Sequence, residues 1–390
     1  MTKAGSKQND KSGVIICGAY GMGNAGDEAI LEAIIREMRA IDPAMPITVL
    51  TRDPEGTRVR FGVRTIHTLN IFGFLRAARQ TALYINGGGS LIQDVTSRRS
   101  LWFYLFTIRA AKRLGCRVLM YGCGIGPVLY KGDIRLTRRV LNRCVDAITL
   151  REPDSMAQLE KFGVTAPEII LASDPALTLP PAPEAEIDAV MSESGADPQG
   201  RYLCFALRRW PGFMEKAPAF SAAARYGHEK YGLTPLFLSI NHRNDSDAAK
   251  AVIAGLSETP YRALPGPLPP ELAIGVISRM EIVVSMRLHG LIFAAGRGVP
   301  LVGVSYDPKV TAFLRCVEGG CVELPDVTAE MLCALIDSAA AQRQNRAELA
   351  KNVRRLLDME DRNVETAEKL LGIEGRNVET VKKLLGKDVS

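Results

Sequence analysis

The sequence predicts an α/β protein built from two doubly wound domains that face each other across a cleft. Short apolar runs alternate with helical patterns along the first half, as expected for a parallel sheet covered on both faces by helices. A Pro-rich break at residues 179–183 interrupts this alternation, which then resumes. With 390 residues, the chain is long enough for two domains that each bury a core.

Each half contributes its own set of strands. In the first half we expect strands at residues 14–17, 47–50, 83–86, 117–122, 147–150 and 168–171. Between them, Ile30, Ile34 and Met38 repeat at helical spacing, and residues 101–114 form a helix that Gly115 ends. In the second half we expect a helix at about 270–279 and strands at 202–207, 236–239, 282–285, 301–304 and 322–324.

These elements divide the chain into four parts. We expect a disordered segment at residues 1–13, a first domain at 14–182, a second domain at 183–340 and a charged helical tail at 341–390. The tail contains a duplication, because residues 362–372 and 376–386 agree at nine of eleven positions. A solvated helix is the simplest interpretation of this tail, and an oligomerisation helix or a membrane-surface helix is the alternative.

The charge balance limits the classes of ligand. There are 49 basic and 43 acidic residues, giving a net charge of +6. This excess suits an anionic small ligand or an anionic membrane surface, whereas nucleic-acid binding normally needs a concentrated basic stripe. No apolar run reaches the ~18–20 residues of a membrane helix. The eight cysteines form no C-x-x-C pair and no metal-ligand spacing occurs, so we expect a cytoplasmic protein without a metal ion.

Three glycine-rich segments follow strands of the first half. They are GAYGMGNAGDEA at residues 18–29, NGGGSLIQD at 86–94 and GCGIGP at 122–127. Glycines let a ligand approach the backbone, and the helix that opens at the first motif favours an anion. The spacing differs from the dinucleotide fingerprint, which argues against a nicotinamide cofactor. Asp27 either caps this helix or contacts substrate, and the sequence does not decide between these roles.

Cationic side chains follow three other strands. Arg151 comes at the end of the strand at 147–150. In the second half, Arg287 and His289 follow one strand and Lys309 follows the next. Because carboxyl ends of parallel strands share one sheet edge, Arg287, His289 and Lys309 converge, and we expect these three potential cations to need an anion. Arg151 either binds a carboxylate or phosphate group or forms a salt bridge with a neighbouring acid.

The chain resembles the polysaccharide pyruvyl transferase family, especially its bacterial cell-wall-polymer members. The resemblance covers about residues 14–335 and rests on the first two glycine motifs, on LRE at 150–152, on SMRLHG at 285–290 and on SYDPK at 305–309. It implies two Rossmann-like domains of glycosyltransferase-B type. It also implies transfer of pyruvate from phosphoenolpyruvate to a sugar as a cyclic ketal, with no cofactor.

For the cell-wall group, the resemblance implies an N-acetylmannosamine acceptor, pyruvylated across its 4- and 6-hydroxyls. The acceptor would be carried on a lipid diphosphate at the cytoplasmic face of the membrane, and the ketal charge would serve the anchoring of surface-layer proteins. Peripheral membrane contact and homo-oligomer formation stay open, and no nucleic-acid partner is expected.

Site roles follow from this chemistry, which needs cations for the donor, a general acid and a base for the hydroxyl. We assign catalysis to Asp27, Arg287, His289 and Lys309. The phosphoenolpyruvate residues are Arg151, Arg287, Leu288, His289 and Lys309. The acceptor residues are Asn24, Asp27, Asn86, Gly88, Gly89, Gln93 and Asp94.

Two other functions remain as alternatives. A nucleotide-sugar glycosyltransferase shares the two-domain architecture and the glycine loops. A non-catalytic anion-binding protein would keep the cationic cleft, although simple binding does not require a titratable imidazole such as His289.

Overall fold

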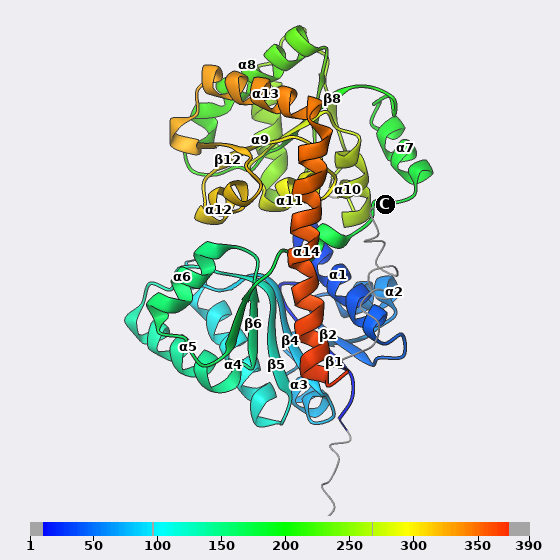
Figure 1. The fold of residues 1–390 in the computed structure, drawn as a ribbon. Helices are drawn as coiled ribbons and strands as arrows, with labels where there is room; N and C mark the ends of the chain where they lie inside the picture. The colour runs from blue at the N-terminus through cyan, green and yellow to red at the C-terminus, as the bar shows by residue number, and fades with distance from the viewer. Residues whose placement is uncertain (1–10, 96, 267, 374–390) are drawn as a thin grey trace, which may run out of the picture.

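The computed structural model describes residues 11–95, 97–266 and 268–373, which form two α/β units stacked one on the other (Figure 1). Each unit has a parallel sheet. The first sheet has the strand order β3-β2-β1-β4-β5-β6-β7, and the second has the order β10-β9-β8-β11-β12-β13. In both, the chain starts in the middle and winds outward in two directions, which is the doubly wound topology that the sequence predicts.

The first sheet and its helices use residues up to Leu171. Its strands are β1 (Val14–Cys17), β2 (Ile47–Thr51), β3 (Arg64–His67), β4 (Leu83–Ile92), β5 (Arg117–Ile125), β6 (Ala147–Leu150) and β7 (Glu168–Leu171). Its helices are α1 (Ala25–Ile41), α2 (Pro54–Phe61), α3 (Ile71–Ala78), α4 (Arg98–Arg113), α5 (Lys131–Cys144) and α6 (Pro153–Phe162). A 3₁₀ turn, η1 (Pro175–Thr178), and α7 (Glu184–Glu193) lead to the second sheet.

The second sheet has the strands β8 (Tyr202–Ala206), β9 (Thr234–Phe237), β10 (Arg262–Ala263), β11 (Ile282–Ser285), β12 (Leu301–Ser305) and β13 (Gly320–Glu323). Its helices are α8 (Phe213–Tyr231), α9 (His242–Ile253), α10 (Pro270–Ser278), α11 (Leu288–Gly296), α12 (Pro308–Cys316) and α13 (Ala329–Gln344), with a 3₁₀ turn η2 (Leu324–Asp326). The last described helix is α14 (Arg346–Leu371).

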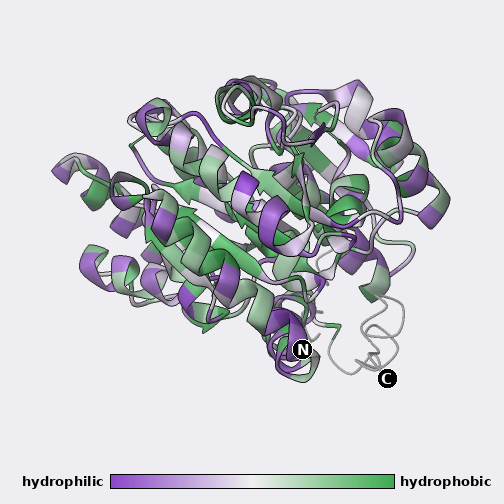
Figure 2. Ribbon diagram, turned by 90° about the horizontal axis from the view of Figure 1, so that it is seen from above, coloured by the Kyte–Doolittle hydropathy of each residue, from purple (hydrophilic) through white to green (hydrophobic). Residues whose placement is uncertain are grey.

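The hydropathy of the elements explains the layering. The central strands are hydrophobic, whereas the helices are hydrophobic on one side and hydrophilic on the other (Figure 2). In the first unit, α3, α4, α5 and α6 pack into one apolar core on one face of the sheet. On the other face, α1 packs into a core that continues through the interface into the second unit.

Two glycine motifs differ from the prediction. We expected the segments at 86–94 and 122–127 to leave the sheet as loops, but most of each stays in the extended strands β4 and β5. The two strands remain paired beyond the glycines, with an irregular register between Gly89 and Ile92. Gly88, Gly89 and Gly122 have positive φ angles, which place bulges at this edge without breaking the ladder. The short edge strands β3 and β10 were not predicted.

The expectation of a solvated tail is wrong for its described part. Helix α14 crosses from the second unit back to the first and packs against η1, β5 and β6 (Figure 1). Val364 and Ala367 are buried there, and Asn363 donates a hydrogen bond to the Ser173 carbonyl at 2.9 Å. The charged composition hid this buried face, because the face itself contains the carboxyl side chains Glu360, Asp361 and Glu368. The second repeat, at 376–386, lies outside the described residues.

The start of the chain also differs in part. Residues 1–10 lie outside the described residues. Ser12 donates a backbone hydrogen bond to Gln80 at 3.1 Å, and the Lys11 ammonium donates to the Leu114 carbonyl. Residues 11–13 therefore belong to the folded unit, in contrast to the expected disordered segment at 1–13.

Candidate active site

The carboxyl edges of the two sheets meet where α1 begins. Ala25 N donates to the Ile240 carbonyl at 3.1 Å, which joins the first turn of α1 to the second unit. Gly26, one residue on, lies against the His289 ring: a Cβ built at Gly26 would be 2.0 Å from His289 Nδ1. A glycine is therefore required for this approach, and the motif that carries Asp27 faces the motif that carries His289.

On the first side, Asn24 and Asp27 form one hydrogen-bonded unit. The Asn24 Oδ1 caps α1 by accepting from Gly26 N, and its Nδ2 donates to Asp27 Oδ2 at 2.6 Å. The sequence left Asp27 open as a cap; in the structure, Asn24 is the cap. Burial raises the pKa of Asp27 to about 6, against the lowering effects of the Asn24 hydrogen bond and of the Arg151 and Lys309 charges. This carboxyl group therefore titrates close to neutral pH.

Arg151 lies in a buried cluster with two carboxylates. Its Nη1 donates to Asp174 Oδ2 at 2.7 Å and its Nε to Glu152 Oε2 at 3.0 Å. Its Nη2 donates to Ser90 Oγ at 3.3 Å. Gly124 packs directly against this cluster, and a Cβ at this position would lie only 2.6 Å from Glu152 Oε1. The third glycine motif therefore makes room for the arginine and its partners.

On the second side, Arg287 is also held by a carboxylate. Its guanidinium pairs with Asp245, with Nε donating to Oδ1 at 2.9 Å. The other oxygen of Asp245 accepts from the backbone amides of Ile240 and Asn241. Leu288, the next residue, is buried and begins α11.

His289 lies between the two units. Its Nε2 is buried and has no hydrogen-bond partner among the described residues, and Asp174 Oδ2 lies 3.8 Å away. Burial lowers the pKa of His289 to about 4; Asp174 opposes this shift, and Arg151, Lys309 and Arg287 add to it. The imidazole is therefore neutral at pH 7.

Lys309 is the most accessible cation of the predicted set, with 29% of its side chain exposed. Its ammonium lies 3.0 Å from Asp307 Oδ2, and the Oδ1 of the same aspartate caps α12. We expected Arg287, His289 and Lys309 to need an anion; in the structure Arg287 and Lys309 each have a carboxylate partner, as Arg151 does, and the His289 imidazole is neutral. The sequence did not reveal these partners, since Asp174 and Asp245 lie 23 and 42 residues from the arginines they bind.

The predicted acceptor residues fall into two groups. Gly89 lies beside Asp27, since a Cβ there would be 3.6 Å from Asp27 Oδ1. Asn86 is fully buried, and neither atom of its side-chain amide has a hydrogen-bond partner among the described residues. Burying such an amide without a partner costs about 1–3 kcal/mol.

The other acceptor residues have structural contacts. Gly88 packs on Ile30, and Gln93 packs on Gly126. The Asp94 carboxylate accepts from the backbone amides of Leu129 and Tyr130. Asp94 thus holds the segment before α5.

Two features of the site were not predicted from the sequence. Asp174 joins Arg151 to His289 across the interface, but follows β7 without a glycine motif. Arg208, after β8, is clamped by two aromatic rings: its Cζ lies 4.8 Å from the Trp210 ring and 4.9 Å from the Tyr306 ring. Its Nη1 donates to the Tyr306 hydroxyl at 2.5 Å, and its buried Nε has no hydrogen-bond partner in the part of the chain that the structure describes. The sequence signal that could have identified Arg208 was the run RRW at 208–210, two arginines and a tryptophan that follow a buried strand.

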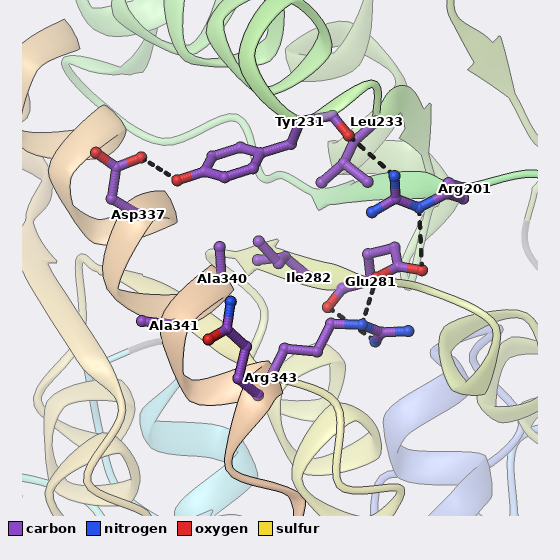
Figure 3. Close-up of a pocket in the computed structure, with 10 residues that line it drawn as sticks. Arg201, Tyr231, Leu233, Glu281, Ile282, Asp337, Ala340, Ala341 and Arg343 are labelled. Carbon is purple, nitrogen blue, oxygen red and sulfur yellow. Dashed lines mark hydrogen bonds and ion pairs between the residues drawn. The ribbon is translucent and has the colours of Figure 1, made fainter.

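A cavity of about 540 Å³ lies at the opposite, amino end of the second sheet (Figure 3). Its charged side chains pair with one another: Arg201 and Arg343 both contact Glu281, and Asp337 accepts from the Tyr231 hydroxyl at 2.6 Å. Because these charges are satisfied, we place the chemistry at the interface instead. Among the described residues there is no cluster of ligands for a metal ion and no helix long and apolar enough to cross a membrane.

The sequence model of one family, polysaccharide pyruvyl transferase, matches residues 24–308, which include both sides of this interface. The chain belongs to the polysaccharide pyruvyl transferase family. It is therefore a transferase, as the sequence predicted. No curated protein matches the chain.

Solved structures show the same fold as this pyruvyl transferase at low sequence identity. A glycosyltransferase from Rickettsia africae has a TM-score of 0.60 at 13% identity, covering 92% of this chain and 99% of its own. A putative UDP-N-acetylglucosamine 2-epimerase from Listeria monocytogenes has a TM-score of 0.61 at 10% identity, covering 87% and 90%. Anabaena HepE in complex with UDP-glucose has a TM-score of 0.58 at 11% identity, covering 96% and 98%. The fold is thus of the glycosyltransferase-B type, as predicted.

Proposed function

We propose that this pyruvyl transferase moves pyruvate from phosphoenolpyruvate to a sugar diol and forms a cyclic ketal. The acceptor we favour is an N-acetylmannosamine residue of a lipid-diphosphate-linked cell-wall precursor, modified at its 4- and 6-hydroxyls. The observation that carries the proposal is the juxtaposition of Asp27 and His289. Asp27 lies on α1 of the first unit and His289 on α11 of the second, and Gly26, next to Asp27, packs against the His289 ring within one charged cluster.

The reaction balances without a cofactor. The methylene carbon of phosphoenolpyruvate takes a proton, two acceptor oxygens bond to the adjacent carbon, and the bond from that carbon to phosphate breaks. Over the whole reaction, one hydroxyl proton ends on the new methyl group and the other leaves with phosphate. The protein must supply a base for the hydroxyls, a proton carrier at the donor and cations for its charge.

Asp27 suits the role of the base. With a pKa of about 6, its carboxylate is mostly ionised at pH 7 yet still basic enough to take a proton from a hydroxyl. Asn24 holds its Oδ2, and the adjacent Gly89 leaves room for a sugar beside its Oδ1. The unpartnered amide of Asn86 supports acceptor binding on the same side.

His289 suits proton transfer at the donor. Its ring is neutral before the donor binds, and a polyanionic donor placed beside Nε2 would raise its pKa. The protonated imidazole would thus be available mainly when phosphoenolpyruvate is present.

For the donor charge, Lys309 and Arg208 are our main candidates. Lys309 is partly accessible, and its ion pair with the partly exposed Asp307 would break when it binds the donor. Arg208 contacts Tyr306, three residues before Lys309, and has no acidic partner among the described residues. We keep Arg287, Arg151 and Leu288 at the donor side as groups that shape the site, because both arginines are already paired.

The test is phosphate release from phosphoenolpyruvate, measured with and without a synthetic lipid-diphosphate disaccharide that ends in N-acetylmannosamine. We expect acceptor-dependent release and an acceptor mass gain equal to pyruvic acid minus water. Thermal shifts with phosphoenolpyruvate and with UDP-glucose separate this function from that of a nucleotide-sugar glycosyltransferase. Stabilisation by UDP-glucose alone, with no phosphate release, would contradict the proposal.

A further inference from the structure

The outer surface of the α3, α4 and α5 layer differs from an ordinary solvated surface in its charge. Residues 69–144 contain thirteen basic and two acidic residues, although the whole chain has a net charge of only +6. Both acids are buried and bonded within the protein. Asp94 accepts from backbone amides, and Asp133 accepts from Arg98 and from the Trp102 indole at 2.9 Å. The exposed charge contributed by this stretch is therefore entirely positive.

The same surface exposes large apolar side chains. At the start of α3, Phe72 is 87% exposed and Ile71 is 44% exposed. On α4, Trp102 and Phe106 are both more than 40% exposed. Before α5, Leu129 is 65% exposed. Water solvates such side chains poorly, and clusters of them usually mark a binding surface.

The basic and apolar side chains are interleaved. On α4, Arg99, Trp102, Phe106 and Arg109 repeat at helical spacing and are all exposed, so they share one face. The N-terminal ends of α4 and α5 are in contact: the guanidinium of Arg98, on α4, lies 4.2 Å from the ring of Tyr130, which precedes α5. The same guanidinium lies 5.0 Å from the Trp102 ring. The face of α5 continues the pattern with exposed Lys131 and Arg135.

The position of this surface relates it to the site. Helices α3, α4 and α5 follow the parallel strands β3, β4 and β5, so their first turns lie at the carboxyl edge of the sheet, where Asp27 and Gly89 also lie. Helix α14 packs on β5, β6 and η1 with α1, on the other face of the sheet, and does not belong to the α3–α6 core. Within the described part of the chain, α14 therefore leaves the outer face of the α3–α5 layer uncovered, beside the acceptor side of the site.

We propose that this face, which we call the α3–α5 face, docks the protein on an anionic lipid bilayer. Phe72, Leu129 and Phe106 would enter the interfacial region, while Arg99, Lys131 and Arg135 would contact anionic headgroups. Aliphatic side chains such as Leu129 neither stack on bases nor pair with phosphates, so a nucleic acid would leave them unused. The proposal rests on the proposed function in one respect: a lipid-linked acceptor would present its sugar at the edge that holds Asp27.

The test is co-sedimentation of the full chain with vesicles, without any substrate. We expect binding to vesicles of phosphatidylglycerol and phosphatidylcholine, little binding to phosphatidylcholine alone, and release as salt is raised. Arg99→Gln and Lys131→Gln should each weaken binding about fivefold. Phe72→Ser with Leu129→Ser should weaken binding at all salt concentrations. All four side chains are exposed, so the variants should remain folded.

Matched controls lie elsewhere on the protein. Met331→Ser on α13 and Lys351→Gln on α14 remove exposed side chains of the same kinds and should leave vesicle binding unchanged. The proposal is overturned if all variants bind the anionic vesicles as strongly as the wild-type protein does, or if the wild-type protein does not bind these vesicles. It is also overturned if this face binds duplex RNA instead, or joins two copies of the chain in solution, as sedimentation velocity would detect.

The two proposals fail separately. Vesicle binding without pyruvyl transfer would leave the docking face standing and remove the proposed chemistry. Pyruvyl transfer to a soluble, short-chain acceptor without vesicle binding would do the reverse. If both hold, Phe72→Ser with Leu129→Ser should reduce turnover of a vesicle-embedded acceptor but not of the soluble one.

Discussion

The two sheet edges that meet at the site have opposite chemistry. The first edge presents Asp27, the amides of Asn24 and Asn86, and glycines that leave space. The second presents Lys309, Arg208 and the neutral ring of His289. Both edges come from the same doubly wound topology, so the fold alone does not explain the difference. The difference matches a reaction in which a neutral diol needs a base and an anionic donor needs cations.

The largest expected effect comes from the second edge. His289→Ala should lower turnover by about 100-fold to 10,000-fold, because it removes the group that moves a proton at the donor. The measurement is phosphate release at saturating acceptor, with the melting temperature as a check on folding. A variant with near-normal turnover would remove His289 from the mechanism.

Asp27→Asn tests the first edge, with an expected loss of about 100-fold. Wild-type kcat/KM should fall below pH 6 as Asp27 takes up a proton, and the variant should lack this acidic limb. If the acidic limb persists in the variant, another group is the base.

The same variant should change the pH dependence of stability. The folded-state pKa of Asp27, about 6, lies above its ordinary value of 3.8, so the folded chain holds more protons between these pH values. The stability contribution of Asp27 therefore falls as pH rises through this window. Asp27→Asn should remove that fall, which urea unfolding at pH 4 and pH 7 can measure.

Asp174→Asn tests the link between the edges. The change keeps the oxygen that accepts from Ala176 N but turns an amide nitrogen toward Arg151 or His289. We expect at least about tenfold lower kcat, since the carboxylate charge that lies 3.8 Å from His289 Nε2 is lost. Because Asp174 raises the pKa of His289, the variant should lower that pKa further, as imidazole NMR can show. Lower kcat with an unchanged His289 titration would make Asp174 merely structural.

The smallest effect concerns the packing that joins the edges. Gly26→Ala places a methyl group against His289, and we expect about 1–3 kcal/mol of destabilisation. Gly132→Ala on α5 is the control, because a Cβ there meets open space. Equal melting temperatures for the two variants would argue against a closed interface at Gly26.

Many strands of both sheets could be predicted from short apolar runs in the sequence. The strands β1, β6, β7 and β11 have the predicted bounds. Three of them, β1, β6 and β11, are short runs of residues buried on both faces, and β7 carries the apolar run Ile169–Leu171 although it is only partly buried. The positions of His289 and Lys309 at neighbouring strand ends followed directly. The edge strand β3 was missed because its sequence, RTIH, contains no apolar run, whereas the equally exposed edge strand β7 has one.

Local sequence patterns were enough to predict the fold class, the order of the motifs and the ends of β1, β6, β7 and β11, because these depend on neighbours along the chain. The pairing of Asp174 with Arg151 and of Asp245 with Arg287 became visible only in the folded chain, as did the extension of β4 and β5 through their glycines. The return of α14 to the first unit, where Asn363 donates a hydrogen bond to a backbone carbonyl 190 residues away, was equally hidden. Such contacts depend on strand order and on how the two sheets face each other, which local composition does not encode.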